Sequence, residues 1–181
     1  MADARSELSA VLLADDPHSS LGDQARIFDR FAGTWDCDYT HFGADGAIAE
    51  RYPGQLVFGW IIDGRAMQDV WIGYPAALTG RARSIGTSVR FFDAKSGLWK
   101  VVFIMPEAGV ITTVTGGAVG DRIVLEGESL DHSRRRWSFN DIRPDSFTWR
   151  GERSEDEGRT WRTTAEYRMT RPGRQPASPG A

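Results

Sequence analysis

From Gly33 onward, apolar and polar residues alternate in almost every segment of this 181-residue chain. A period of two residues is typical of β-strands with one buried face, whereas a helix repeats every 3.6 residues. The connections, among them GADG, PEAG and SEDEG, contain the Gly, Asp and Pro that tight turns require. The pattern predicts about ten antiparallel strands, at residues 33–42, 48–60, 65–74, 85–93, 98–105, 109–116, 121–128, 135–142, 146–153 and 160–170.

Short loops between consecutive strands produce a meander, and a long, strongly twisted meander tends to close on itself. Before the first strand, SSLGDQARIFDRFAGTW has Leu21, Ala25, Phe28 and Phe31 near helical spacing and Gly33 as its stop. We therefore expect an all-β fold: an antiparallel up-and-down β-barrel of about 8–10 strands, preceded by a short N-terminal helix. A barrel of this size is wide enough to hold a small ligand.

The chain length fits one domain with a single core. We expect residues 1–20 to be a flexible lead-in with a short helix at residues 8–13, and residues 21–171 to form the barrel. Residues 172–181, rich in Pro, Gly and Ser, are expected to be a disordered tail. The long connection at residues 75–84 is predicted to be a lid or portal, because long loops in compact barrels often carry function.

Charge and cysteine content restrict the partners and the compartment. With 22 Lys and Arg against 25 Asp and Glu the net charge is −3, so the overall charge predicts neither nucleic acid nor an anionic membrane as partner. The run Arg134, Arg135 and Arg136 is interpreted as a solvated strand edge. The only cysteine, Cys37, excludes an intramolecular disulfide and is interpreted as a packing residue in a reducing compartment.

Neither a membrane span nor a signal peptide is expected. No apolar run reaches the roughly 18 to 20 residues that a transmembrane helix needs. The N-terminus lacks a basic start and a cleavage-site pattern. These features together predict a soluble, cytoplasmic protein.

Tryptophan is the residue type that best indicates a use for the barrel. All seven tryptophans fall in predicted strands, at positions 35, 60, 71, 99, 137, 149 and 161. Aromatic residues favour strands and commonly build cores. Several of them could instead line a cavity for a flat apolar molecule, and the sequence leaves both interpretations open.

Two segments carry a resemblance to a known family. They are FAGTWDCDYTHFGADG, where GTW opens the first strand after a short helix, and NDIRPDSFTWRGERSEDEGRTW. The chain resembles the lipocalin-like calycin superfamily and, more specifically, bacterial DUF1579-like domains, over about residues 24–171. The resemblance implies a barrel with a cavity and supplies no catalytic residues, since fold does not imply function.

One calycin-like branch binds haem, so the three histidines are candidates for an axial ligand. His18 lies in the lead-in and His132 in a turn, which leaves His41. No haem-site motif surrounds His41, and no zinc spacing such as H-x-x-x-H occurs. We therefore expect no cofactor and no metal, with haem on His41 as the minor alternative.

Hairpin pairing gives candidate cavity residues. Closing the turn after Asp93 pairs Phe92 with Trp99, which places Arg90 on the same face as Trp99. A four-residue turn at residues 143–146 pairs Ile142 with Phe147, and hence Asn140 with Trp149. Each pairing inverts if its turn holds one residue more or fewer.

Two functions follow from these candidates. The first is binding of a small apolar molecule, aromatic or polycyclic, by residues that include Trp71, Arg90, Trp99, Asn140 and Trp149. The second is a cofactor-independent isomerase, cyclase or hydro-lyase. Its general acid/base groups would be His41, Tyr39 and Asp69.

The catalytic candidates have simpler alternatives. His41 could be solvated, Asp69 could face water or pair with Arg65, and Arg90 could form a surface cross-strand pair. A homodimer is the default expectation for the oligomeric state. The arrangement of titratable side chains inside the barrel separates a binding site from a catalytic one.

Overall fold

The computed structural model describes residues 3–75 and 83–173. Most of the predicted lid or portal at residues 75–84, and the predicted tail from residue 174 onward, lie outside the described residues.

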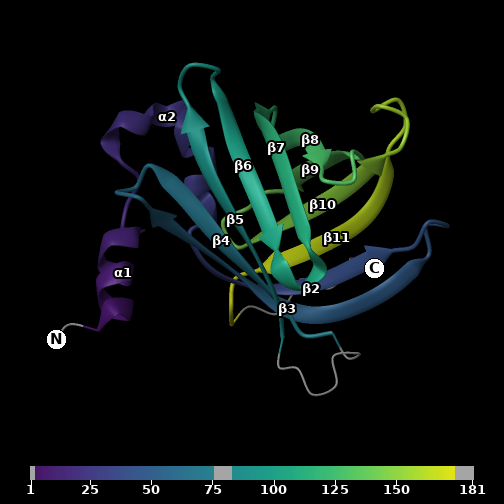
Figure 1. Ribbon diagram of the computed structural model, residues 1–181, viewed down its shortest axis with the longest axis horizontal. Coiled ribbons are helices and arrows are strands. Elements are labelled where there is room, and N and C mark those ends of the chain that lie inside the picture. The colour runs from purple at the N-terminus through teal and green to yellow at the C-terminus, as the bar shows by residue number, and fades with distance from the viewer. Residues whose placement is uncertain (1–2, 76–82, 174–181) are drawn as a thin grey trace.

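Ten strands close into an antiparallel barrel (Figure 1). Each strand pairs with the next, β11 pairs with β2, and the ring is complete because every barrel strand has a neighbour on both sides. The strands are β2 (Gly33–Phe42), β3 (Ile48–Ile61), β4 (Ala66–Gly73), β5 (Ser84–Asp93), β6 (Leu98–Met105), β7 (Val110–Val119), β8 (Arg122–Ser129), β9 (Arg134–Asn140), β10 (Ser146–Ser154) and β11 (Arg162–Thr170). The ten predicted strands correspond to these one for one, so the predicted fold class is confirmed.

The prediction that every tryptophan lies in a strand is wrong for Trp161. This residue precedes β11 and belongs to the connection from β10. Asp156 holds the connection in place, because its carboxylate accepts hydrogen bonds from the backbone N–H and the hydroxyl of Thr160, at 2.8 and 2.7 Å. The Trp161 indole donates to the Gly158 carbonyl at 3.0 Å, so this ring closes a loop instead of extending a strand.

The N-terminal region is more structured than the predicted lead-in. Helix α1 spans Ala4–Leu12, where the sequence predicted a helix at residues 8–13. A two-residue strand, β1 (Leu13–Ala14), pairs with Trp60 and Ile61 of β3. These two residues extend past Phe58, the partner of Gly33 at the start of β2. The helix predicted before the barrel divides into short pieces: η1 (Ser19–Leu21), α2 (Gly22–Ala25) and η2 (Arg26–Phe31). A last short helix, η3 (Pro106–Ala108), lies between β6 and β7.

One end of the barrel is plugged by η2. Its Phe28 and Phe31 are fully buried, and Phe31 lies 4.6 Å from Phe147 and 5.1 Å from Phe139, measured between ring centroids. Trp35 donates its indole N–H to the Phe31 carbonyl at 2.7 Å, which fixes η2 to the first barrel strand. The aromatic core therefore fills this end, and any cavity has to lie toward the other.

Close packing inside the barrel makes Gly54 of β3 a sensitive position. A Cβ there would overlap with the Ile72 carbonyl oxygen and the Tyr39 ring. We expect Gly54→Ala to lower the free energy of unfolding by about 1–3 kcal/mol, the usual cost of overpacking. Urea denaturation measures this change.

Gly59 on the same strand provides the matched control. A Cβ at Gly59 meets no described atom within 4 Å. Gly59→Ala should therefore leave stability unchanged or raise it slightly, because glycine is unfavourable inside strands. Equal losses in the two variants would contradict the packing seen around Gly54.

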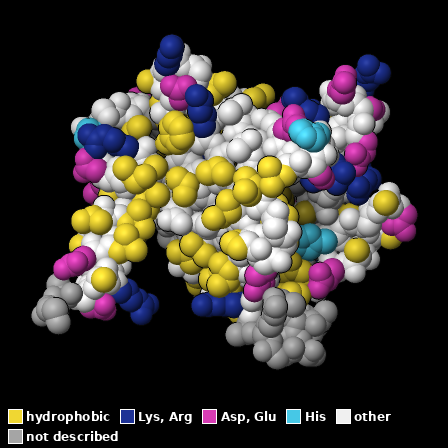
Figure 2. Space-filling view, viewed as in Figure 1, with side chains coloured by type: hydrophobic (Ala, Val, Ile, Leu, Met, Phe, Trp, Pro, Cys, Tyr) yellow, Lys and Arg dark blue, Asp and Glu magenta, His cyan; other side chains and the backbone are white. Residues whose placement is uncertain are grey.

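The outside of the barrel carries an apolar face. Hydrophobic side chains gather across the face formed by β6 and β7 (Figure 2), where Val102, Ile104 and Ile111 are about two-fifths exposed. Ile104 and Ile111 are cross-strand partners, so the exposed groups are contiguous. Contiguous apolar surface of this kind is typical of contact faces, and the homodimer stays a prediction. Within the described ranges, no helix is long and apolar enough to cross a bilayer.

Candidate binding cavity

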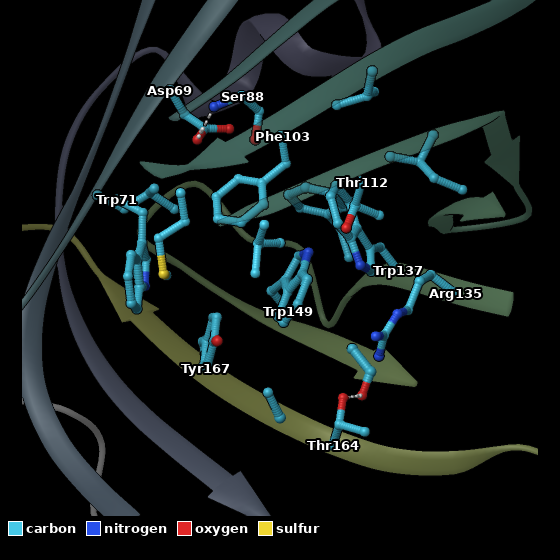
Figure 3. A pocket seen from close by; sticks show the side chains of 18 of the residues that line it. Asp69, Trp71, Ser88, Phe103, Thr112, Arg135, Trp137, Trp149, Thr164 and Tyr167 are labelled. Atoms are coloured by element: carbon cyan, nitrogen blue, oxygen red, sulfur yellow. Dashed lines mark hydrogen bonds between the residues drawn. The ribbon is translucent and has the colours of Figure 1, made fainter. Parts of the chain in front are cut away.

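A cavity of about 290 Å³ occupies the barrel at the end opposite η2. It is lined by alternate, inward-facing residues of the barrel strands, as expected from the strand period of two. Its walls are largely aromatic (Figure 3). Seven Phe, Trp and Tyr residues line the cavity: Phe58, Trp71, Phe103, Trp137, Phe139, Trp149 and Tyr167.

Three rings form a continuous aromatic surface along one side. Trp149 stacks on Tyr167 with centroids 4.6 Å apart and planes 18° apart. Trp137 lies 5.8 Å from Trp149. All three point inward and yet are only half-buried, which means that the cavity reaches solvent. Such a surface offers flat apolar faces to a ligand.

An ion pair lies at the deep end. Arg90 of β5 is 2% exposed and donates from Nη2 to the Asp69 carboxylate of β4, which is 6% exposed. The other carboxylate oxygen of Asp69 accepts the Ser88 backbone N–H at 3.3 Å. The predictions that Asp69 faces water or pairs with Arg65, and that Arg90 forms a surface pair, are wrong. Both side chains occupy inward positions of their strands, and Arg65 pairs with Asp63 outside.

The Arg90 guanidinium is held against aromatic rings. Its central carbon lies 4.8 Å from the Phe28 centroid and 5.1 Å from the Phe58 centroid. Such cation–π contacts partly replace lost hydration. Burial lowers the pKa of Arg90 to about 9, so the guanidinium stays protonated at neutral pH. The deep end therefore holds a charged but neutralised pair.

Three buried N–H donors at this wall have no hydrogen-bond acceptor among the described residues. They are Nε and Nη1 of Arg90 and the indole Nε1 of Trp71. Buried polar groups are almost always hydrogen-bonded, and leaving one unpaired costs about 1–3 kcal/mol. The cavity thus has more donors than the protein itself satisfies.

The mouth of the cavity is polar. Arg135, Glu152, Thr112, Ser129 and Thr164 line this end, and Figure 3 shows Arg135 and Thr164 on the far side of the aromatic wall from Asp69 and Ser88. Arg135 donates from Nε to the Ser129 hydroxyl at 3.3 Å. Polar groups at the mouth and aromatic groups farther in give the cavity two chemically different ends.

His41 also lines the cavity, at the open end of β2. Its Nε2 lies 2.9 Å from the Tyr52 hydroxyl, and the two rings stack with centroids 5.5 Å apart. Burial lowers the pKa of His41 below 6.5, and the nearby Glu50 carboxylate opposes this shift only in part. Because Nε2 is engaged by Tyr52, this geometry does not present that nitrogen as a free haem ligand.

The lowered pKa of His41 predicts a pH dependence of stability. The unfolded chain binds this proton more tightly than the folded protein does, so the unfolding free energy falls as the pH drops below 6.5. The decline ends once the pH is below the folded-state pKa. His41→Gln should remove this part of the slope, as measured by urea denaturation between pH 7.5 and pH 5.

A substitution at an exposed histidine separates this effect from general acid sensitivity. His132, whose side chain is 89% exposed, is the control residue. The difference in slope between His41→Gln and His132→Gln over pH 7.5 to pH 5 is the quantity that tests the prediction. An imidazole NMR titration that placed the pKa of His41 above 6.5 would contradict the prediction.

The three predicted catalytic residues are not brought together. Tyr39 is fully buried, donates its hydroxyl to the Gln55 carbonyl at 2.9 Å, and lies outside the set of residues that line the cavity. Burial raises the pKa of Tyr39 well above its ordinary value. Asp69 is held in its ion pair at the deep end. Its cross-strand partner on β3 is Phe58, and Phe58 in turn pairs with Gly33 at the start of β2, whereas His41 lies near the other end of β2.

Of the predicted ligand-binding residues, Trp71, Arg90 and Trp149 line the cavity, whereas Trp99 and Asn140 do not. The predicted pairing of Phe92 with Trp99 is confirmed, and both Trp99 and Arg90 are buried inside the barrel. Trp99, however, packs at the plugged end, 4.8 Å from Phe28. Register alone could not show which end of the barrel η2 would fill.

The predicted register of Asn140 is wrong by one residue. Asn140 pairs with Thr148, and Phe139 is the partner of Trp149. The connection starts with Asp141 in the left-handed region, at φ 51°, and so differs from the four-residue turn that was assumed. Asn140 therefore leaves the cavity face and donates to the Ser138 hydroxyl at 3.0 Å.

Sequence reasoning missed Phe103, Trp137, Tyr167 and Arg135 as cavity residues. The signal was present for two of them: Arg135 and Trp137 alternate with Phe139 on β9, and the correct register at Trp149 assigns all three to one face. No three His, Cys, Asp or Glu side chains of the described chain are grouped so as to hold a metal ion.

Solved structures with the same fold exist at low sequence identity. An S-type phycobiliprotein lyase, CPES from Guillardia theta, is similar with a TM-score of 0.59 and 12% identity, covering 83% of this chain and 93% of that one. Rv2717c from M. tuberculosis is similar with a TM-score of 0.59 and 14% identity, covering 86% of this chain and 99% of that one. No protein-family model and no curated protein matches this sequence. At these identities the similarity shows the lipocalin-like barrel fold alone.

Proposed function

We propose that this protein binds a flat, largely apolar molecule, aromatic or polycyclic, inside the barrel. One observation carries the proposal: inward-facing, half-buried aromatic rings, foremost Trp137, Trp149 and Tyr167, line a cavity that reaches solvent. A barrel that needed these rings only for its core would pack them out of contact with water, as it does with Phe28 and Phe31.

The size of the cavity restricts the ligand. About 290 Å³ is near the lower limit of small-molecule pockets. Two or three fused rings suit this space. Removing apolar ligand surface from water contributes roughly 25 cal/mol of binding free energy per Å². A flat ring system therefore gains most of its affinity from contact with the wall.

Binding accounts for the site with fewer assumptions than catalysis. A general acid/base enzyme needs titratable groups that converge on one reacting atom. Here Asp69 is held by Arg90, Tyr39 is bonded to the backbone, and His41 lies at the mouth. The fold likeness to a protein named as a phycobiliprotein lyase is compatible with a cavity for a small molecule, but it carries no residue roles to this chain.

The sequence motifs and Cys37 support two further assignments within this proposal. The resemblance of the GTW segment and of residues 140–161 to DUF1579-like domains supports our proposal that the chain is related to bacterial lipocalin-like proteins. Cys37 is buried, with its thiol 3.5 Å from the Met169 sulfur, and burial raises its pKa. An unpaired thiol of this kind suits the reducing cytoplasm.

Native mass spectrometry of the full chain, purified gently from its source, tests the proposal. We expect a co-purified molecule with an aromatic absorption spectrum at up to one per chain. We also expect added three-ring aromatic probes to quench tryptophan fluorescence. The proposal fails if no molecule co-purifies and if fluorene and 9-fluorenone both leave the fluorescence unchanged.

A further inference from the structure

We propose that the deep end of the cavity recognises an uncharged, carbonyl-type oxygen on the bound molecule, with Arg90 as its main hydrogen-bond donor. This inference rests on the proposed binding function and deepens it. It is carried by the unpaired donors at the deep wall and by the neutral charge balance around them.

The first observation is that Arg90 has buried N–H donors without an acceptor among the described residues. A guanidinium has five N–H donors, and among the residues that the structure describes only Nη2 has an acceptor, namely Asp69. Its Nε and Nη1 are buried and have no partner within the described ranges, and the residue itself lines the cavity. The aromatic rings of Phe28 and Phe58 lie close to the guanidinium and offer it no oxygen. An oxygen acceptor on the ligand would satisfy these donors.

The second, independent observation concerns the indole of Trp71. Its indole N–H is also buried without a described acceptor, and the residue lines the same cavity (Figure 3). Cross-strand pairs place it on the same wall: Met67 pairs with Arg90, Asp69 with Ser88, and Trp71 with Gly86. Inward positions along a strand recur about every 6.6 Å. Along the β4–β5 wall, unpaired donors therefore lie on both sides of Asp69, those of Arg90 on one side and that of Trp71 on the other.

The charge around these donors selects the kind of oxygen. Asp69 already neutralises Arg90, and the only other Lys or Arg among the described residues that line the cavity is Arg135, at the mouth. A carboxylate at the deep end would lose its hydration and lie beside the Asp69 carboxylate, an unfavourable pairing of like charges. A ketone, quinone or lactam oxygen accepts the same hydrogen bonds without that cost.

Three probes with one ring skeleton test this inference on the full chain. They are fluorene, which has no oxygen, 9-fluorenone, which has one carbonyl, and fluorene-9-carboxylate. We expect 9-fluorenone to bind at least about tenfold more tightly than fluorene, as measured by calorimetry and fluorescence quenching, because hydrogen bonds to a charged donor are strong. The carboxylate should bind more weakly than 9-fluorenone.

The outcomes separate this inference from the proposed function. Equal affinities for fluorene and 9-fluorenone would overturn the inference and leave cavity binding intact, because water would then satisfy the donors. Tightest binding of the carboxylate would overturn it in favour of an anion site. Binding of none of the three probes would count against the proposed function itself.

Two variants assign the preference to the named donors. In the double variant Asp69→Leu with Arg90→Met, which removes both charges together, the affinity ratio of 9-fluorenone to fluorene should lose most of its wild-type value and keep only the share that the Trp71 donor contributes. Trp71→Phe keeps the aromatic wall and removes one donor, so the ratio should fall by severalfold. A ratio unchanged in both variants would overturn the assignment.

Discussion

Arg90→Met is expected to lower the free energy of unfolding by about 3–5 kcal/mol, the largest stability effect that we predict for a single substitution. The physical reason is what the substitution leaves behind. Asp69 is 6% exposed, and without Arg90 its carboxylate would be buried with the Ser88 N–H as its one described donor. An uncompensated buried charge costs far more than the lost contact itself. Urea denaturation at pH 7 measures the effect.

Two controls show whether the buried charge is the cause. Adding Asp69→Leu to Arg90→Met removes the stranded carboxylate, and stability should return toward that of the wild type. Arg150→Met breaks an ion pair with Glu166 that lies partly in solvent, with Arg150 46% exposed. Its effect should stay within about 1 kcal/mol. If Arg90→Met proved as stable as Arg150→Met, the result would contradict a buried ion pair between Arg90 and Asp69.

Ala165→Phe is expected to weaken binding of 9-fluorenone on the order of a hundredfold, the scale of a central binding contact. Ala165 is buried and lines the cavity. On β11 it stands in register between His41 of β2 and Gly151 of β10. A phenyl ring at this inward position would project into the mouth of the cavity and exclude the ligand. Calorimetric titration measures the loss.

The matched control adds the same ring outside the barrel. Ala49 is exposed on β3, so Ala49→Phe should bind 9-fluorenone with wild-type affinity. Ala165→Phe should remain folded, because its ring enters the cavity and not the packed core, and circular dichroism and denaturation check this. Undiminished binding by a folded Ala165→Phe protein would place the ligand elsewhere and would contradict the proposed site.

The strands could be predicted because their signals are local. Alternation along β2, from Trp35 through Cys37 to Tyr39, and turn residues at each connection depend only on near neighbours in the chain. The same local logic gave the correct pairing of Phe92 with Trp99 across a short turn. It failed at Asn140, because the left-handed Asp141 changes the turn and a shift of one residue moves every side chain to the other face.

The candidate site was predicted only in part, for a reason that lies in closure of the barrel. Trp71, Trp99 and Trp149 have equivalent inward positions in their strands, and the sequence offers no distinction among them. Trp99 differs because η2 inserts Phe28 beside it and fills that end. Tyr39 points inward as well, yet its hydroxyl meets a backbone carbonyl before it reaches the cavity.

By itself, the sequence determined an all-β antiparallel barrel with aromatic inward faces, because a period of two and turn-forming residues act over a few neighbours. Tertiary structure alone decided which aromatic residues pack as a plug and which line a cavity, and it alone paired Asp69 with Arg90 inside the barrel. Those outcomes depend on where the ring closes and which end the N-terminal segment occupies. Contacts between residues far apart in the chain fix both, and no local pattern encodes them.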